Sequence, residues 1–131
     1  DGGAHCGIIC DASFPTYLLT HWTRDRKRGE KLSIPFVVAA QSRKTARSVG
    51  LRDRGVIARG YKADINVIDY DRLHLHPPKV HDDLPVGGRR LLQQFDGYDA
   101  TGVSGVVTQR CGTATGSRPG RLVRGAQAGL Q

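Results

Sequence analysis

The spacing of apolar residues changes once along the chain, near residue 53, and this change limits the folds that the sequence can adopt. Before that point apolar residues recur at the spacing of helices with one buried face. After it they alternate with polar residues, as in half-buried strands. A chain with its helices first and its strands afterwards is typical of two pieces that belong to different domains. We therefore predict a helical part over residues 1–52 and a strand part over residues 53–131.

Three short helices are predicted in the first part, each with a serine at its start. Ser13 and Ser33 can cap a helix, and each is followed two residues later by a proline, which the first turn tolerates. A third helix is predicted from Ser42, and Gly50 is placed to end it in the left-handed conformation. The residues predicted to face inward are Leu18, Leu19, Trp22, Phe36, Val37, Val38, Ala40, Ala46, Val49 and Leu51.

The second part is predicted to form short strands, of which residues 63–69 alternate most clearly. Residues 74–88 contain three prolines and a glycine pair, so an irregular connection is predicted there. The strands carry too little apolar surface for a closed sandwich, and the helices need a partner, so neither part is self-sufficient. The other predicted strands are 89–94, 98–103, 106–110 and 121–123.

The chain has 20 basic and 12 acidic residues among 131, a formal net charge of +8. A basic chain can bind nucleic acid through its phosphates. Here, however, basic residues occur in every segment, mixed with acidic ones and with few aromatic residues, which favours a solvated arginine-rich surface. No stretch approaches the ~20 apolar residues that cross a bilayer. We therefore expect neither nucleic acid nor a membrane as a partner.

The cysteines, Cys6, Cys10 and Cys111, are odd in number and unevenly spaced. This pattern argues against a disulfide framework and favours reduced thiols in the cytoplasm. Cys6 and Cys10 beside His5 could suggest a metal site, but the second pair that a zinc finger needs is missing.

The run Asp1-Gly2-Gly3 places a carboxylate beside two residues that let the backbone turn sharply and approach a ligand closely. An aspartate that caps a loop turn is the alternative interpretation. A domain seldom begins with such a run, and the sequence contains no methionine. We therefore expect the chain to be the C-terminal tail of a longer enzyme. The tail would begin at a catalytic acid, Asp1.

Residues 50–69 read Gly-Leu-Arg-Asp-Arg-Gly-Val-Ile-Ala-Arg-Gly-Tyr-Lys-Ala-Asp-Ile-Asn-Val-Ile-Asp and resemble the C-terminal signature of the amidohydrolase superfamily. The opening run Asp1-Gly2-Gly3-Ala4-His5-Cys6 with Phe14-Pro15, and the closing residues 115–125, resemble the N-acyl-D-amino-acid deacylase (D-aminoacylase) branch. Where that branch has an acidic turn, this chain has Cys111-Gly112-Thr113, which leaves the geometry of the last hairpin open.

The resemblance implies an α/β fold: the loop and helices at the end of a TIM-like barrel, followed by strands of a small composite β-sandwich. The barrel and sandwich strands that come earlier in such enzymes would then be the missing partners. The implied reaction is metal-dependent hydrolysis of the amide bond of an N-acyl-D-amino acid or a related amide. Zinc would lower the pKa of a bound water and polarise the carbonyl.

Within this resemblance, Asp1 matches the acid at the end of the eighth barrel strand. Its implied role is to orient or deprotonate the attacking water and then to protonate the leaving amine, and it is a possible metal ligand. His5, four residues further on, is a candidate for contact with the substrate. A catalytic zinc takes about three protein ligands, so we expect the 131-residue chain to be inactive by itself.

Other polar residues have simpler interpretations. His74 and His76 form a His-x-His pattern, but they follow the signature strand and run into two prolines, so we predict that they anchor a loop. Asp64 and Asp69 are predicted to be architectural, with Asp64 fixing the turn into its strand through backbone N–H groups. Two alternatives to an enzyme part stay open: a non-catalytic remnant and a basic nucleic-acid-binding module.

Overall fold

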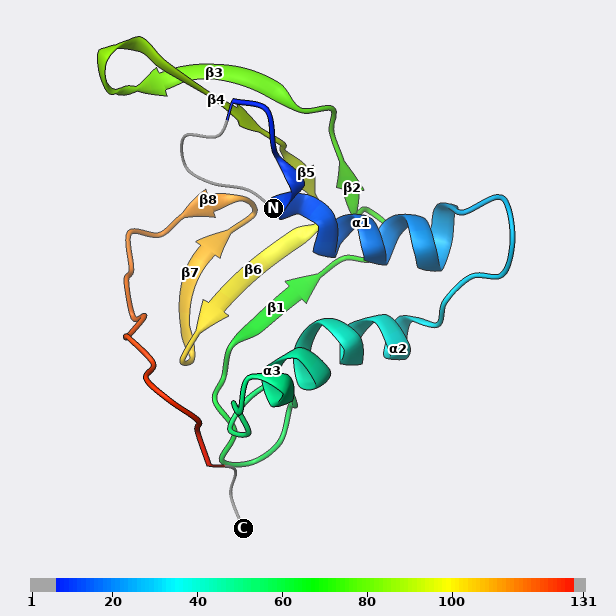
Figure 1. Ribbon diagram of the computed structural model, residues 1–131, viewed down its shortest axis with the longest axis vertical. Helices are drawn as coiled ribbons and strands as arrows, with labels where there is room; N and C mark the ends of the chain where they lie inside the picture. Colours follow the sequence, from blue (N-terminus) through cyan, green and yellow to red (C-terminus); the bar gives the residue numbers. More distant parts are fainter. Residues whose placement is uncertain (1–6, 129–131) are drawn as a thin grey trace.

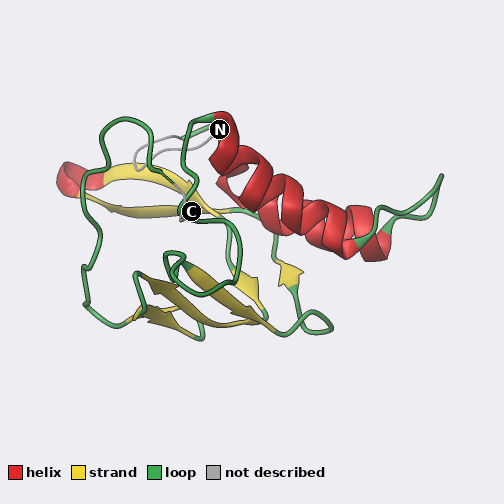
Figure 2. Cartoon of the chain, turned by 90° about the horizontal axis from the view of Figure 1, so that it is seen from below, coloured by secondary structure: helices red, strands yellow, loops and turns green. Residues whose placement is uncertain are grey.

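The computed structural model describes residues 7–128 as helices beside antiparallel strands (Figures 1 and 2). No described helix is long and apolar enough to cross a membrane. The helices are α1 (Phe14–Thr20), α2 (Ile34–Ala39) and α3 (Thr45–Ser48). The strands are β1 (Ile65–Ile68), β2 (His74–Leu75), β3 (Lys79–Leu84), β4 (Gly88–Leu92), β5 (Phe95–Asp96), β6 (Tyr98–Val103), β7 (Val106–Arg110) and β8 (Thr113–Ala114).

Two of the helices are extended by π-helical turns. α1 continues as a π-helical turn over His21–Asp25, and a second one, Ala40–Lys44, joins α2 to α3. The prediction of a separate helix starting at Ser42 is therefore wrong. The Ser42 hydroxyl donates a hydrogen bond of 2.5 Å to the carbonyl of Val38, four residues back, so it is used inside the helix and not at a cap.

The predicted helix ends are right in two places and wrong in one. The Ser33 side chain accepts a hydrogen bond of 3.4 Å from the Phe36 N–H, as a capping serine does. Gly50 has φ 78°, as predicted for a left-handed terminator. Ser13 makes no capping bond. It ends a 3-10 turn, Asp11–Ser13, that precedes α1, and the Ser13 hydroxyl bonds instead to the Cys10 carbonyl and the Gln93 side chain.

Within residues 7–128 the strands form three antiparallel sheets. The largest has the order β1-β6-β7-β8, and two pairs, β2 with β5 and β3 with β4, stand beside it (Figure 1). β6 and β7 match the predicted ranges 98–103 and 106–110 to the residue, β1 lies within 63–69, and β4 overlaps 89–94.

Two strand predictions are wrong. Residues 74–88 contain β2 and β3, because Pro77 and Pro78 lie between these strands and Pro85 begins the turn at the hairpin tip. The prolines therefore delimit the strands without interrupting them. Residues 121–123 form no strand; the tail is held instead by a parallel bridge between Leu51 and Gln127.

The apolar core of the described residues is small. Val37 and Leu73 are fully buried and Ala46 is 8% exposed. Several residues predicted to face inward lie at the surface instead: Phe36 and Val38 are each 48% exposed, and Val49 is 66% exposed. The apolar faces of the helices in this part of the chain are therefore only partly covered.

Polar contacts join the helices to the strands. The Thr16 and Tyr98 hydroxyls lie 2.8 Å apart, and Thr16 is buried in α1. The Arg24 guanidinium donates to the carbonyls of Tyr70, at 2.5 Å, and Leu73, at 2.7 Å. Because Leu73 is fully buried, these bonds fix the loop after β1 against the helical layer.

Candidate functional site

The residues predicted to carry the chemistry lie mostly outside the described part of the chain. Asp1, His5 and Cys6 precede Gly7, where the description begins. Within residues 7–128 no group of three His, Cys, Asp or Glu side chains could hold a metal ion. The described residues therefore do not fit the zinc that the resemblance implies.

His74 and His76 lie on and just after β2, beside β5. His76 Nε2 lies 2.7 Å from an Asp96 carboxylate oxygen, and the two imidazole rings meet edge to face with centroids 5.0 Å apart. His74 is paired with Asp96 in the strand register. These contacts hold a two-stranded sheet together at the surface.

Asp64 and Asp69 were both predicted to be architectural, and Asp64 was predicted to bind backbone N–H groups in the turn into its own strand. Asp64 does bind a backbone N–H group, but in another turn. Its carboxylate accepts a hydrogen bond of 2.9 Å from the N–H of Ser104, in the turn between β6 and β7. Asp69 accepts bonds from the Arg72 backbone N–H, at 3.2 Å, and from Arg72 Nε, at 2.5 Å. Asp64 therefore fixes a neighbouring hairpin, and Asp69 fixes the turn after its own strand.

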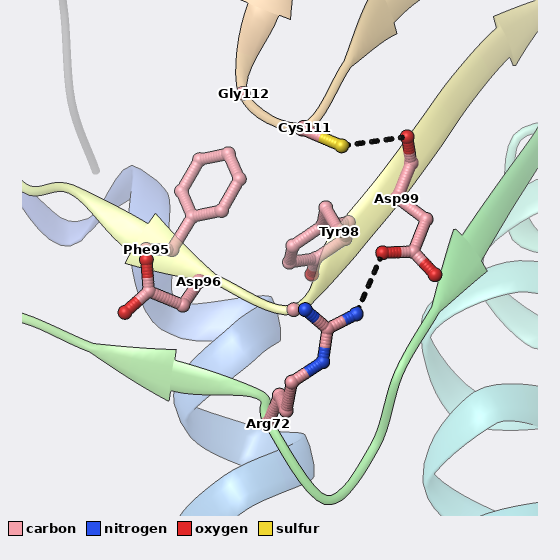
Figure 3. Close-up of a pocket in the computed structure, with 8 residues that line it drawn as sticks. Arg72, Phe95, Asp96, Tyr98, Asp99, Cys111 and Gly112 are labelled. Carbon is pink, nitrogen blue, oxygen red and sulfur yellow. Dashed lines mark hydrogen bonds and ion pairs between the residues drawn. The ribbon is translucent and has the colours of Figure 1, made fainter.

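A cavity of about 400 Å³, here the Arg72 pocket, lies where β5, β6 and the β7–β8 turn meet (Figure 3). Arg72 donates to Asp99 at 3.0 Å, and the rings of Phe95 and Tyr98 lie 4.8 Å apart. Its lining residues are Arg72, Phe95, Asp96, Gly97, Tyr98, Asp99, Cys111 and Gly112.

The charged side chains that line the Arg72 pocket are all paired: Arg72 with Asp99 and with Asp69, which does not line the cavity, and Asp96 with His76. The hydrogen bond from Arg72 lowers the pKa of Asp69, and the same bond raises the pKa of Arg72. The hydrogen bond from Arg72 therefore favours the ionised form of Asp69. These contacts give Arg72, Asp69 and Asp99 a structural role, in which they hold the turn after β1 against β6.

The turn between β7 and β8 consists of Cys111 and Gly112, with φ 45° and 76°. A two-residue hairpin turn of type I′ requires positive φ at both residues. Cys111 and Gly112 thus form a tight turn where the family branch has an acidic one, with Cys111 in the left-handed region. The Cys111 thiol lies 3.9 Å from the Asp99 carbonyl oxygen.

A second cavity, here the β1 groove, has a volume of about 580 Å³ and lies between α1, α2 and β1. Its walls are mainly apolar, and one end carries Lys62 and Asp64, whose charged atoms are 3.7 Å apart. The alternation over 63–69 predicted a half-buried strand, but no signal in it could show that β1 borders a groove.

Residues 7–128 form helices and antiparallel strands, and none of their His, Cys, Asp and Glu side chains gather into a group that could hold a metal ion. The chain belongs to the amidohydrolase family: the profile of the Amidohydrolase family matches residues 1–109. This range contains Asp1, His5, all the helices and most of β7. No curated protein and no solved structure matches the chain. Membership indicates a hydrolase, in a family that is generally metal-dependent.

Proposed function

We propose that this chain is the C-terminal part of a metal-dependent amidohydrolase that hydrolyses N-acyl-D-amino acids or related amides. The family match, which includes Asp1, is the observation that carries the proposal. The likeness of residues 1–6 and 115–125 to the deacylase branch supports the substrate class. The two free cysteines of the described residues, Cys10 and Cys111, are compatible with a cytoplasmic enzyme.

Asp1 is the proposed catalytic acid and base. An aspartate is ionised at neutral pH, so it can take a proton from the attacking water and return that proton to the departing amine. His5 is the proposed contact to the substrate. Residues 7–128 offer no metal-binding cluster, so the ligands of a zinc ion would come from Asp1 and from earlier segments of the polypeptide.

The exposed apolar surface supports a larger assembly. Ile65 and Val67 of β1 are 40% and 52% exposed, and they share one face of the strand. The Tyr98 hydroxyl bonds to α1, so the helices lie over the opposite face, which carries Tyr98 and its partner Ile68. We propose that further sandwich strands cover Ile65 and Val67, and that barrel elements cover the exposed sides of α1 and α2.

The test uses the reading frame upstream of Asp1. A polypeptide with an in-frame barrel should hydrolyse N-acetyl-D-amino acids, lose activity with a chelator and regain it with zinc. The 131-residue chain alone should be inactive in the same assay with zinc. A stop codon directly upstream would favour the remnant. Hydrolysis by the 131-residue chain alone would overturn the proposed dependence on earlier segments.

A basic binding module remains a second candidate because 12 of the 20 basic residues lie in residues 21–62, with 3 acidic ones. We propose that these residues form a solvated surface. The protein should then pass through a heparin column at about physiological salt. Retention that falls steeply with salt would support nucleic-acid binding instead.

A further inference from the structure

We propose that the Arg26 side chain holds the loop of residues 26–33, here the α1–α2 loop, closed and thereby protects it from proteases that cut after lysine or arginine. The inference does not depend on the proposed hydrolase activity. The α1–α2 loop projects beyond the ends of the two helices that it joins (Figures 1 and 2). Residues 27–31, which include Lys27, Arg28 and Lys31, are all exposed. Exposed loop tips are the usual sites of proteolytic nicking.

The Arg26 guanidinium binds the α1–α2 loop from its inner side. Its Nε donates a hydrogen bond to the Arg28 carbonyl, and its Nη1 donates one of 3.0 Å to the Glu30 carbonyl. The guanidinium carbon also lies 4.5 Å from the centroid of the Trp22 ring. A guanidinium is planar, so it can stack on a ring and still donate from its edge. One side chain therefore fixes two carbonyls of the loop against the preceding π-helical turn.

Further contacts close the ends and the tip of the α1–α2 loop. The Leu32 N–H donates to the Trp22 carbonyl at 2.8 Å, and the Lys31 ammonium donates to a carbonyl of the same turn, that of Arg24. Gly29 has φ 74°, and a Cβ there would lie 2.6 Å from Arg26 Nη2. The backbone thus folds around the guanidinium, and the tip needs a residue without a side chain.

The closed loop is a poor substrate for a protease, which binds its target as an extended strand through free backbone groups. Arg26 already occupies two of these carbonyls, and Gly29 turns the chain out of the extended conformation. Cleavage should therefore follow the fraction of molecules in which the loop is open. Hydrolysis of the peptide bond after Lys27 would break the covalent link between α1 and all the strands.

The test is limited digestion of the 131-residue protein with a protease that cuts only after lysine, followed by mass spectrometry. Arg26→Gln keeps every lysine but loses the paired donors, so cleavage after Lys27 and Lys31 should be about tenfold faster than in the wild type. Cleavage after Lys79, exposed on β3, is the internal reference and should keep its rate. Arg47→Gln removes the same charge from an exposed position of α3 and should be digested like the wild type.

A second pair of variants tests the tip of the α1–α2 loop. Gly29→Ala places a methyl group against the Arg26 guanidinium and should also speed cleavage after Lys27. Gly125→Ala has a similar φ of 67° but no atom within 4 Å of its Cβ position, and it should leave that cleavage unchanged. Equal cleavage after Lys27 in the wild type and in Arg26→Gln would overturn the proposal. So would an equal acceleration after Lys79, because the protein would then open as a whole.

Discussion

At the scale of single residues, Arg72 joins the turn after β1 to β6. It bonds to Asp69 at 2.5 Å and to Asp99 at 3.0 Å. The bond from Arg72 lowers the pKa of Asp69 from its ordinary value of 3.8. A carboxyl with a lowered pKa stabilises the fold above its unfolded pKa, and this stability is lost as pH falls through the folded pKa.

The wild-type protein should therefore lose stability between about pH 5 and pH 3, and the Arg72→Gln variant should lose less of it. Urea midpoints at these two pH values measure the difference. Arg28→Gln is the control, because Arg28 is exposed and its side chain forms no ion pair with a carboxylate within residues 7–128. An unchanged pH dependence in Arg72→Gln would exclude this ion pair as a source of the acid sensitivity.

At the scale of elements, β5 and β6 are joined through Gly97, which lies directly on the turn before β2. Gly97 has φ 92°, and a Cβ built there would lie 2.6 Å from the Leu73 Cα. Any side chain would both strain the backbone and collide with the backbone of a buried residue. Gly105 has a similar φ of 79°, but no atom lies within 4 Å of its Cβ position.

We expect Gly97→Ala to cost more than ~2 kcal/mol of unfolding free energy, because strain and collision add. Gly105→Ala should cost about 1 kcal/mol, from the left-handed conformation alone. Urea denaturation of the two variants gives both values. Equal losses would show that the contact between Gly97 and Leu73 is not as close as described.

The element scale also shows what the sequence could and could not predict. β6 and β7 were predictable because the turn residues Ser104 and Gly105 separate two short strand candidates, and both turn residues do have positive φ. The hairpin of β3 and β4 was not predictable. Pro77 and Pro78 before it and Pro85 at its tip indicate an irregular connection when only the sequence is considered. The continuous helix over 34–48 was missed because Ser42 resembles a cap, while its hydroxyl bonds within the helix.

At the scale of the whole molecule, the small core makes stability depend on few side chains. Leu73→Ala removes most of a fully buried side chain and should cost about 2–5 kcal/mol. A protein with so small a core should then be partly unfolded at 25 °C by circular dichroism. Leu122→Ala is the control, since Leu122 is 76% exposed. Equal stability of the two variants would contradict the description of the core.

Family membership was predictable from residues 50–69, and the structure explains part of that signature physically. Gly50, Gly55 and Gly60 all have positive φ, and a Cβ at Gly55 would lie 2.8 Å from the Arg43 backbone. These glycines are needed for the path of the chain. The candidate site was less predictable, because Asp1 and His5 lie outside the described residues.

The measurement that tests the central claim most directly is kcat of the complete amidohydrolase with Asp1→Asn, beside Asp82→Asn as an exposed control on β3. Loss of general acid and base catalysis should lower kcat by roughly 10²–10⁴-fold in the first variant only. Circular dichroism should show both variants folded. An Asp1→Asn enzyme with wild-type kcat would contradict the account.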